Sequence, residues 1–456
     1  MQVPEQKGDT EPEERPARQA GKRAVLLVAS SDGLRIVAPL PVDGAATIGR
    51  APGDAPVATA DGPASSTLLP DGLLSRQHLR IAHTERGYEA ADLESRNGTL
   101  LDGRRLQQPT RLSDGCILLF GGYVGVFRLV TDAELAALRL EADTPFGPVA
   151  TFSPALALTY ERLRKLARTD TELLLAGETG VGKEVCARAI HQASGRAGAF
   201  ITVNCAALPA TLVESDLFGH VAGAYSTAKR AKPGLVEAAD GGTLLLDEIG
   251  EAARELQAKI FRFLQDRTYM PLGATRVRRA DVRVLAATTR TNIGPDGKAL
   301  RPDLVARLGA EPITIPALRR RAEEIAPLVA HFSTSVVRRI EPAALRAMAL
   351  YGWPLNVREL EKTLANAIAL SSDGELLLEN LPGAVRGALE RGAPIEVRPR
   401  KPRAAPDRQE LEQILKQHEG NVASVARALD RQWNVVWRWM AKHGLRPEGF
   451  RKKKEE

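Results

Sequence analysis

The sequence predicts a multidomain protein with an N-terminal β-sandwich, a central α/β domain that carries a small helical lid, and a C-terminal all-α domain. Three observations predict this order. Short apolar runs separated by Gly, Asp and Pro fill residues 22–131, apolar strands alternate with helical patterns over residues 145–385, and only helical spacing follows in residues 407–447. A length of 456 residues is typical of about three domains.

Composition excludes several classes of protein. Hydrophobic residues make up 44% of the chain, and its apolar runs are too short to span a bilayer. Residues 1–21 are charged, so we expect a disordered tail there and no secretory signal. The 3 cysteines are too scattered for a disulfide framework or a zinc site, and we expect buried, reduced thiols. These features favour a cytoplasmic protein without a membrane partner.

The first domain is expected to be built from short strands. The runs are Ala24–Ala29, Leu34–Ala38, Ala46–Ile48, Leu79–Ala82, Gly87–Ala91, Cys116–Phe120 and Val124–Val130. The segment between Arg50 and Ser75 is rich in Ala, Pro and Gly and is expected to be a long loop. Residues 132–144 are expected to form a linker with helical character.

Polar groups lie at the ends of these strands, at Arg50, at Ser75–His78 and at Asn97–Thr99. A guanidinium group together with hydroxyl and amide donors on fixed loops suits a phosphate dianion. The pattern resembles the forkhead-associated (FHA) domain, which binds phosphothreonine peptides. The resemblance implies that Arg50 and Ser75 hold the phosphate with help from Arg76, that Asn97 bonds the peptide backbone, and that His78 braces the loop. The alternative is that Arg50 and His78 only tie loops together.

A glycine-rich turn joins the apolar run Leu173–Ala176 to a helical pattern. Such a turn lets backbone N–H groups converge at a helix start, which favours a polyphosphate, and Lys183 adds a full positive charge. Glu184 replaces the usual Ser or Thr and removes a hydroxyl that could bind magnesium. The alternative is a glycine-rich turn with a chance lysine. The expected ATP-binding residues are Gly177, Glu178, Thr179, Gly180, Val181, Gly182, Lys183 and Glu184.

A second chemical signal is the apolar run Thr243–Leu246, which ends in Asp247 and Glu248. One carboxylate would hold Mg²⁺ and the other would polarise the water that attacks the γ-phosphate. Alone the pattern is weak, because an apolar run can simply enter a loop. Placed 64 residues after Lys183 in an alternating α/β pattern, it predicts a nucleotide hydrolase with ATP and Mg²⁺ as cofactors.

Residues 145–385 resemble the bacterial enhancer-binding proteins, the AAA+ ATPases that remodel RNA polymerase carrying sigma-54. The motifs that carry the resemblance are GETGVGKE at 177–184, VNCAA at 203–207, ESDLFGH at 214–220, the Asp247–Glu248 pair and WPLNVREL at 353–360. Glutamate after the loop lysine is usual in this family. The resemblance implies a bacterial protein, a helical lid over about residues 320–385, and a hexamer or heptamer ring formed from a resting dimer.

Catalytic roles follow from this resemblance. It implies that Asp247 is the magnesium-side acid and that Glu248 is the base that activates water. Asn204 would restrain Glu248 until a partner protein is engaged. Thr288 and Thr289 fall where the family has its sensing polar residue.

The resemblance also implies three functional arginines. Arg301 and Arg307 match the arginines that reach the neighbouring subunit's nucleotide, and Arg358 matches the sensor arginine of the lid. A guanidinium group delivered at the transition state speeds phosphoryl transfer. The alternative for Arg301 and Arg307 is a pair of solvated surface side chains.

The loop expected to contact sigma-54 departs from the family's GAFTGA sequence. Tyr keeps the ring of Phe and Ser keeps the hydroxyl of Thr, but Thr replaces the second Gly and removes an easy positive-φ position. The contact could therefore survive or be lost. The residues of this loop are Gly223, Ala224, Tyr225, Ser226, Thr227 and Ala228.

The C-terminal end is basic, with 15 Lys and Arg against 9 Asp and Glu from Ile395 to Glu456. A linker over residues 386–406, basic and proline-rich from Pro394 to Pro406, precedes three short helices, and a basic tail covers 448–456. The helices resemble a Fis-type helix-turn-helix, which implies DNA binding. Gln432, Asn434 and Arg438 on the third helix suit base edges or phosphate. The alternative is a packing or dimerisation motif.

Together these features predict an ATP-dependent transcriptional activator with four kinds of partner. These are an upstream activating or enhancer sequence in DNA, the sigma-54 holoenzyme, a phosphothreonine protein such as a Ser/Thr kinase, and further copies of the chain. The alternative is a DNA-bound repressor or scaffold that uses ATP for assembly and does not activate sigma-54.

Overall fold

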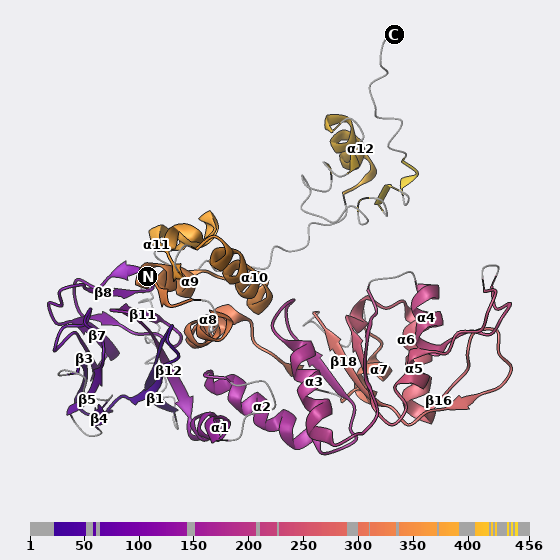
Figure 1. Ribbon diagram of the computed structural model, residues 1–456, viewed down its shortest axis with the longest axis horizontal. Coiled ribbons are helices and arrows are strands. Elements are labelled where there is room, and N and C mark those ends of the chain that lie inside the picture. Colours follow the sequence, from indigo (N-terminus) through magenta and orange to yellow (C-terminus); the bar gives the residue numbers. More distant parts are fainter. Residues whose placement is uncertain are drawn as a thin grey trace, which may run out of the picture. The chain divides into compact units, whose positions relative to one another are not determined.

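The computed structural model describes residues 22–51, 58–60, 64–143, 151–206, 210–225, 228–289, 300–309, 311–333, 337–371, 374–391, 406–418, 421–422, 425, 436, 439–440 and 443–445. The chain divides into two compact units, Met1–Ile395 and Glu396–Glu456, and each is described by itself. Figure 1 shows the helices and strands along the chain. Within the described part, no helix is long and apolar enough to cross a membrane.

The first domain is a β-sandwich, as predicted. Its first sheet has the strand order β2-β1-β12-β11-β8-β9 and its second sheet the order β10-β7-β6-β3-β5-β4. Side chains such as Leu26, Ile48 and Phe120 fill the space between the sheets. The strands are β1 (Lys22–Ser30), β2 (Arg35–Pro39), β3 (Ala45–Arg50), β4 (Ala58–Ala60), β5 (Ala64–Leu69), β6 (Leu79–Thr84), β7 (Gly87–Asp92), β8 (Thr99–Leu101), β9 (Arg104–Arg105), β10 (Thr110–Arg111), β11 (Ile117–Phe120) and β12 (Tyr123–Thr131).

The prediction of a loop between Arg50 and Ser75 was wrong for β4 and β5. Strand β5 pairs in parallel with β3 and antiparallel with β4. The buried side chains of β5 are Ser65, Thr67 and Leu69. Buried and more exposed side chains alternate along β5, as is typical of a strand. Two of the three buried side chains are small and polar, so the hydrophobic pattern of the sequence does not indicate the strand.

The central α/β domain has a parallel sheet in the order β14-β15-β18-β13-β19. Helices α2 and α3 pack on one face of this sheet, and α4 to α7 pack on the other. The strands are β13 (Leu173–Ala176), β14 (Phe200–Asn204), β15 (Thr243–Asp247), β18 (Arg283–Thr288) and β19 (Ile313–Thr314). The helices are α2 (Pro154–Ala167), α3 (Lys183–Ser194), α4 (Ala210–Phe218), α5 (Leu235–Ala238), α6 (Arg254–Asp266) and α7 (Pro302–Arg307), with a 3-10 turn η1 (Ile249–Glu251) and a small hairpin of β16 (Thr268–Tyr269) and β17 (Arg278–Arg279).

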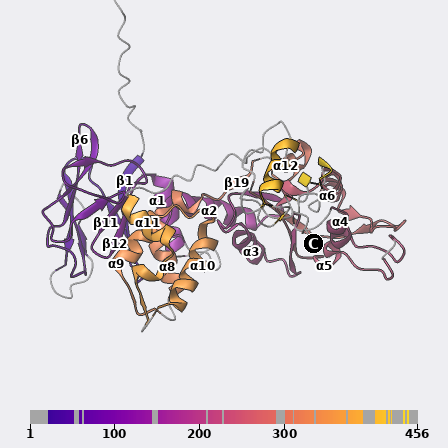
Figure 2. The same ribbon diagram turned by 90° about the horizontal axis from the view of Figure 1, so that it is seen from above.

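A helical lid follows the sheet. It contains α8 (Ile325–Ser333), α9 (Pro342–Leu350), α10 (Asn356–Ala369), α11 (Gly383–Arg391), the 3-10 turns η2 (Leu318–Arg320), η3 (Ala322–Glu324) and η4 (Leu378–Asn380), and the strand pair β20 (Arg339–Ile340) and β21 (Glu375–Leu376). Figures 1 and 2 both place α8 and α9 beside β11 and β12 of the sandwich. Helix α1 (Asp132–Asp143) continues directly from β12 and packs against α2.

The second unit contains α12 (Arg408–Gln417), which begins with a capping box between Asp407 and Glu410. Apolar residues from all three predicted helices form one cluster: Leu411, Leu415, Val425, Val436, Met440 and Leu445. The predicted base-reading residues Gln432, Asn434 and Arg438 lie outside the described residues.

Candidate functional site: a nucleotide site between sheet and lid

The glycine-rich turn lies at the carboxyl end of β13, where α3 begins. Gly177, Gly180 and Gly182 all have positive φ. The Lys183 side chain is buried, and its Nζ donates to the carbonyl oxygens of Gly177 at 2.9 Å and Glu178 at 3.3 Å. Burial lowers the pKa of Lys183, while the two carboxylates of the site, Glu248 and Asp247, oppose the shift. The ammonium group therefore occupies the cradle in which a phosphate would bind.

The two predicted carboxylates lie at the end of β15, close to this lysine. Glu248 Oε1 lies 3.8 Å from Lys183 Nζ, and Glu248 has the left-handed backbone conformation, with φ of 52°. Burial and the nearby Glu248 raise the pKa of Asp247. Two carboxylates and an ammonium group thus converge at the carboxyl ends of parallel strands, an arrangement suited to a Mg²⁺–triphosphate.

Glu248 is held by Thr289, which follows β18. Glu248 Oε2 accepts from the Thr289 backbone N at 3.1 Å and from the Thr289 hydroxyl at 2.9 Å. Asn204 lies at the end of β14, paired in register with Asp247, and its side-chain oxygen accepts from the Ala206 N at 2.8 Å. The contact of Thr289 with the glutamate is one that sequence reasoning did not assign.

The lid touches the glycine loop directly. The Val357 N donates to the Gly180 carbonyl at 3.0 Å, and Asn356 Nδ2 donates to the Thr179 carbonyl at 3.0 Å. A Cβ atom on Gly180 would lie 2.2 Å from the Leu355 carbonyl oxygen and 3.0 Å from the Cβ of Arg358. The glycine therefore permits close approach of the lid, and this approach brings Arg358 to the loop.

Sequence reasoning missed Arg319 and the role of Asn356. Arg319 makes two hydrogen bonds to the Glu178 carboxylate, at 2.7 and 2.5 Å, and these bonds lower the pKa of Glu178. Asn356 Nδ2 also lies 3.2 Å from Glu178 Oε2. Asn356 has φ of 56°, in a conformation that Asn tolerates better than most residues. Asn356 stands in the recognised WPLNVREL motif, but no local pattern shows that Glu178 would be its partner.

The loops at one edge of the sandwich are connected by hydrogen bonds. The Arg50 N donates to the Ser75 carbonyl at 2.9 Å, and Ser75 Oγ accepts from the Arg96 N at 3.1 Å. His78 is fully buried, and its ring bonds the Ser75 N at 3.2 Å and the Gly98 carbonyl at 3.3 Å. These bonds bring the predicted phosphate-binding loops together at one edge.

Asn97, which was predicted to bond the peptide backbone, lies at the same edge. Its Nδ2 donates to the Leu73 carbonyl at 2.7 Å. Arg76 is exposed, and it lies in the loop between β5 and β6, whereas Asn97 lies in the loop between β7 and β8. A Cβ atom on Gly49 would lie 1.9 Å from the Arg76 carbonyl oxygen, so the strand before Arg50 needs glycine at this point.

Three family models match the chain. Residues 149–314 match the sigma-54 interaction domain, residues 319–396 match the AAA+ ATPase lid domain, and residues 46–121 match the FHA domain. The regulatory protein AtoC of Escherichia coli is 35% identical over 324 residues, which cover 68% of this chain and 70% of AtoC. The chain belongs to the family of AAA+ regulators with a sigma-54 interaction domain. Its central domain is an AAA+ ATPase domain, and its sandwich is an FHA domain.

Other relatives are matched over a smaller share of their length. The nitrogen fixation protein AnfA of Azotobacter vinelandii is 37% identical over 300 residues, which cover 64% of this chain but only 56% of AnfA. The chain thus spans little more than half of this relative. Among solved structures, NtrX from Brucella abortus in complex with ADP has a TM-score of 0.48 and 27% identity, over 67% of this chain and 72% of that chain.

In the sigma-54 interaction domain, hydrogen bonds hold the base of loop 223–228, the loop whose sequence differs from the family's GAFTGA. The Gly223 N donates to the Ala228 carbonyl at 2.8 Å, and the Ala228 N donates to the Tyr225 carbonyl at 2.9 Å. The Tyr225 ring lies 5.0 Å from the ring of His220, and 37% of the residue's surface is exposed. A ring is therefore presented at the surface, next to Ala224. Ser226 and Thr227 lie outside the described residues.

The arginines predicted to act on a neighbouring subunit are bonded away from Lys183. Arg301 forms an ion pair with Asp303 at 2.7 Å, and this hydrogen-bonded carboxylate raises the pKa of Arg301. Arg307 is exposed, and its Nη2 donates to the Leu264 carbonyl at 3.0 Å. Arg301 immediately precedes α7 and Arg307 is its last residue, and in the described part of the chain both side chains bond residues of α6 or α7.

Proposed function

We propose that the chain hydrolyses ATP in a ring of subunits and uses the energy to remodel RNA polymerase carrying sigma-54 into open complexes. The observation that supports this most strongly is the convergence of Lys183, Asp247 and Glu248 within a domain matched as a sigma-54 interaction domain. In this proposal Lys183 and the loop N–H groups bind the phosphates. Asp247 holds Mg²⁺ through the nucleotide, and Glu248 polarises the attacking water.

The remaining residues complete the proposed site. Arg358 reaches the phosphates from the lid, and Arg301 and Arg307 act on the nucleotide of the next subunit. Asn204 remains a candidate for restraining Glu248, in addition to Thr289, which bonds Glu248 directly. Because the arginines would come from a second copy, hydrolysis is expected to depend on assembly.

Transcription in vitro tests the coupling to sigma-54. The assay combines the full chain, ATP, sigma-54 holoenzyme and a promoter with its upstream DNA. Tyr225→Ala removes the exposed ring, and Tyr225→Phe is the matched control that keeps it. We expect Tyr225→Ala to retain ATP hydrolysis but lose open complexes, while Tyr225→Phe retains both.

The same assay tests the second candidate, an ATP-dependent repressor or scaffold. The substitution of Thr227 for the family's glycine favours that candidate. Wild-type protein that hydrolyses ATP, binds the DNA and yields no open complex would support it and refute the activator proposal.

The proposed input is a phosphothreonine protein, with a Ser/Thr kinase as one candidate. The match to the FHA domain and the hydrogen-bonded loops around Arg50, Ser75 and Asn97 support this proposal. Fluorescence anisotropy with a labelled phosphothreonine peptide library tests it. Arg50→Ala should abolish binding, whereas Arg80→Ala, an exposed change on β6, should not.

The proposed output site on DNA depends on the sequence of the C-terminal helices and on the basic charge around them. Substituting Arg438 with Ala should weaken protection of the upstream DNA in a footprint, and unchanged protection would contradict the assignment. Binding should also fall steeply with salt, because phosphate contacts release counterions.

A further inference from the structure

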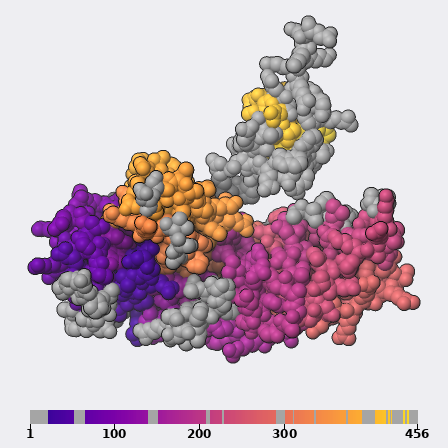
Figure 3. All heavy atoms as spheres, viewed as in Figure 1, coloured from indigo at the N-terminus to yellow at the C-terminus, as the bar shows by residue number. Residues whose placement is uncertain are grey.

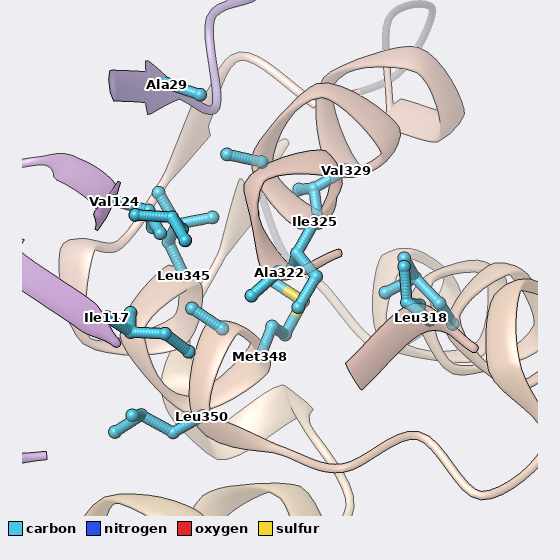
Figure 4. Packing of buried hydrophobic residues seen from close by; sticks show 14 of the residues in the cluster. Ala29, Ile117, Val124, Leu318, Ala322, Ile325, Val329, Leu345, Met348 and Leu350 are labelled. Carbon is cyan, nitrogen blue, oxygen red and sulfur yellow. The ribbon is translucent and has the colours of Figure 1, made fainter. Parts of the chain in front are cut away.

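The outer face of the first sheet of the FHA domain is covered by the ATPase lid. Val124 and Ile117 from the sheet lie in the same buried cluster as Leu345 and Met348 of α9 and Ile325 of α8. Figure 4 shows these side chains between the strands and the lid helices, and Figure 3 shows the lid atoms directly against those of the sandwich on the face in view. Burial of this apolar surface holds the two parts together.

Polar groups at the same contact are incompletely paired. Arg128 on β12 donates to Glu323 at 2.7 Å and to the Arg320 carbonyl at 2.6 Å, and Arg346 on α9 donates to the Gly121 carbonyl at 2.8 Å. Among the described residues, the buried side-chain atoms without a hydrogen-bond partner include Arg128 Nε, Glu323 Oε1 and Arg346 Nε. Each such atom carries a desolvation cost. Apolar burial therefore stabilises the contact between sandwich and lid, whereas the unpaired polar atoms in it lower its stability.

The FHA domain is also attached to the α/β part of the ATPase. Helix α1 continues from β12 without a break and packs against α2, the first helix of that part. Ala137 and Leu138 of α1 share a buried cluster with Phe152 and Ala157. The sandwich is therefore linked to the lid directly and to the α/β part through α1.

The boundary between the lid and the α/β part contains the nucleotide site. The lid contacts the glycine loop through Val357, Asn356 and Arg358, so a movement of the lid relative to the sheet would change the surroundings of a nucleotide bound at Lys183. Hinge opening of this kind commonly limits turnover. A sandwich linked to both the lid and the α/β part would restrain such a movement between them.

A continuous set of contacts leads from the predicted peptide loops to the lid. Asn97 bonds the Leu73 carbonyl, and the Asp71 carboxylate accepts from the Leu73 N and from the Gly122 N, both at 2.8 Å. Arg346 bonds the Gly121 carbonyl next to Gly122. Asp71 and Arg346 thus bond the backbone of two adjacent residues, Gly122 and Gly121. Burial lowers the pKa of Arg346, and the Asp71 carboxylate opposes that shift.

We infer that the FHA domain is a clamp in cis, which slows nucleotide release by joining the lid to the α/β part, and that phosphopeptide binding loosens the clamp through Asp71 and Arg346. The second half rests on the proposed phosphothreonine binding, whereas the clamp itself does not. The ligand class is a phosphothreonine peptide, and the regulated step is loss of ADP.

Release of a fluorescent N-methylanthraniloyl-ADP from the full chain, followed by stopped flow, tests the clamp. Val124→Asp places a carboxylate in the apolar contact and should speed release at least threefold without peptide. Arg346→Met keeps the side-chain stem, removes the bond to Gly121 and serves as a milder variant if the first does not fold. We expect it to speed release about twofold and to abolish the response to peptide. Arg80→Met, exposed on the second sheet, should behave as wild type.

The outcomes separate the two halves. Folded Val124→Asp or Arg346→Met that releases ADP at the wild-type rate would overturn the clamp. A labelled phosphothreonine peptide library that binds wild type but leaves its release rate unchanged would overturn the coupling alone. A library that does not bind at all would refute the proposed phosphothreonine function, while the peptide-free rates of the variants would still decide the clamp.

Discussion

The contact between Thr289 and Glu248 leads to a specific kinetic prediction. Thr289→Val keeps the shape of the side chain but removes the hydroxyl that donates to Glu248 Oε2 at 2.9 Å. The backbone N–H of residue 289 still donates at 3.1 Å. The glutamate therefore loses one of two hydrogen bonds that orient its carboxylate toward the phosphate site.

The size of the effect follows from the nature of this bond. A hydrogen bond to a charged group contributes about 1.5–3 kcal/mol. Because the backbone bond remains, we take the lower part of this range, about 1.5–2 kcal/mol, which corresponds to a decrease of roughly 10- to 30-fold in rate. The loss should fall on kcat, since in the proposed mechanism Glu248 acts on water in the transition state and not on bound ATP.

Steady-state phosphate release at saturating and limiting ATP measures kcat and KM separately. Thr289→Ser keeps the hydroxyl and is the matched control, expected within about threefold of wild type. Asn204→Ala, whose side chain bonds the Ala206 N, should change basal kcat less than Thr289→Val does. Either of two results would refute the reasoning. An unchanged kcat for Thr289→Val would show that the hydroxyl does not orient Glu248 for hydrolysis, and an increased kcat would show that it holds the glutamate in a resting position.

Other expectations concern assembly, acid stability and the lid. Arg307→Ala should bind ATP but not hydrolyse it, and mixing it with inactive Lys183→Ala should restore part of the phosphate release if the arginine acts across subunits. Burial lowers the pKa of His78 below its ordinary value, so the unfolded chain binds a proton that the folded chain does not, and stability should fall as pH drops below about 6.5. Calorimetry of the full chain should show a weaker acid dependence in His78→Gln but not in the exposed His83→Gln. Gly180→Ala should weaken ATP binding more than tenfold by equilibrium anisotropy, since φ of 78° and the nearby lid carbonyl leave no room for a methyl group.

Much of the nucleotide site could be predicted because its chemistry is local in the sequence. The turn ending in Lys183 is contiguous, and Asp247 and Glu248 end a single strand. The partner of Glu248 could not be derived in the same way. Strand β15 lies between β14 and β18, so both Asn204 and Thr289 flank the carboxylates, and only side-chain geometry distinguishes them.

The sandwich was predictable as a fold, but its contact with the lid was not. β1 is buried without interruption from Ala24 to Ser30, and all of β11 is buried. Uninterrupted burial is typical of strands covered on both faces, and the apolar run at Ala24–Ala29 is consistent with it. The covering residues, such as Leu345 and Met348, come more than two hundred residues after β11 and more than three hundred after β1, and no periodicity in either segment identifies the other.

The lid is the element through which sensing and hydrolysis can be connected. Non-directional apolar burial alone would hold the sandwich on the lid without fixing its orientation, whereas the buried pair of Arg128 and Glu323 has a single favourable geometry. The same lid places Arg358 and Asn356 against the glycine loop. Because packed interfaces shift between discrete arrangements, a change at the sandwich edge would reach the nucleotide as a change in the population of closed lids. The proposed control by phosphopeptide therefore requires no movement of Asp247 or Glu248, only a change in the fraction of time for which the lid is closed on their site.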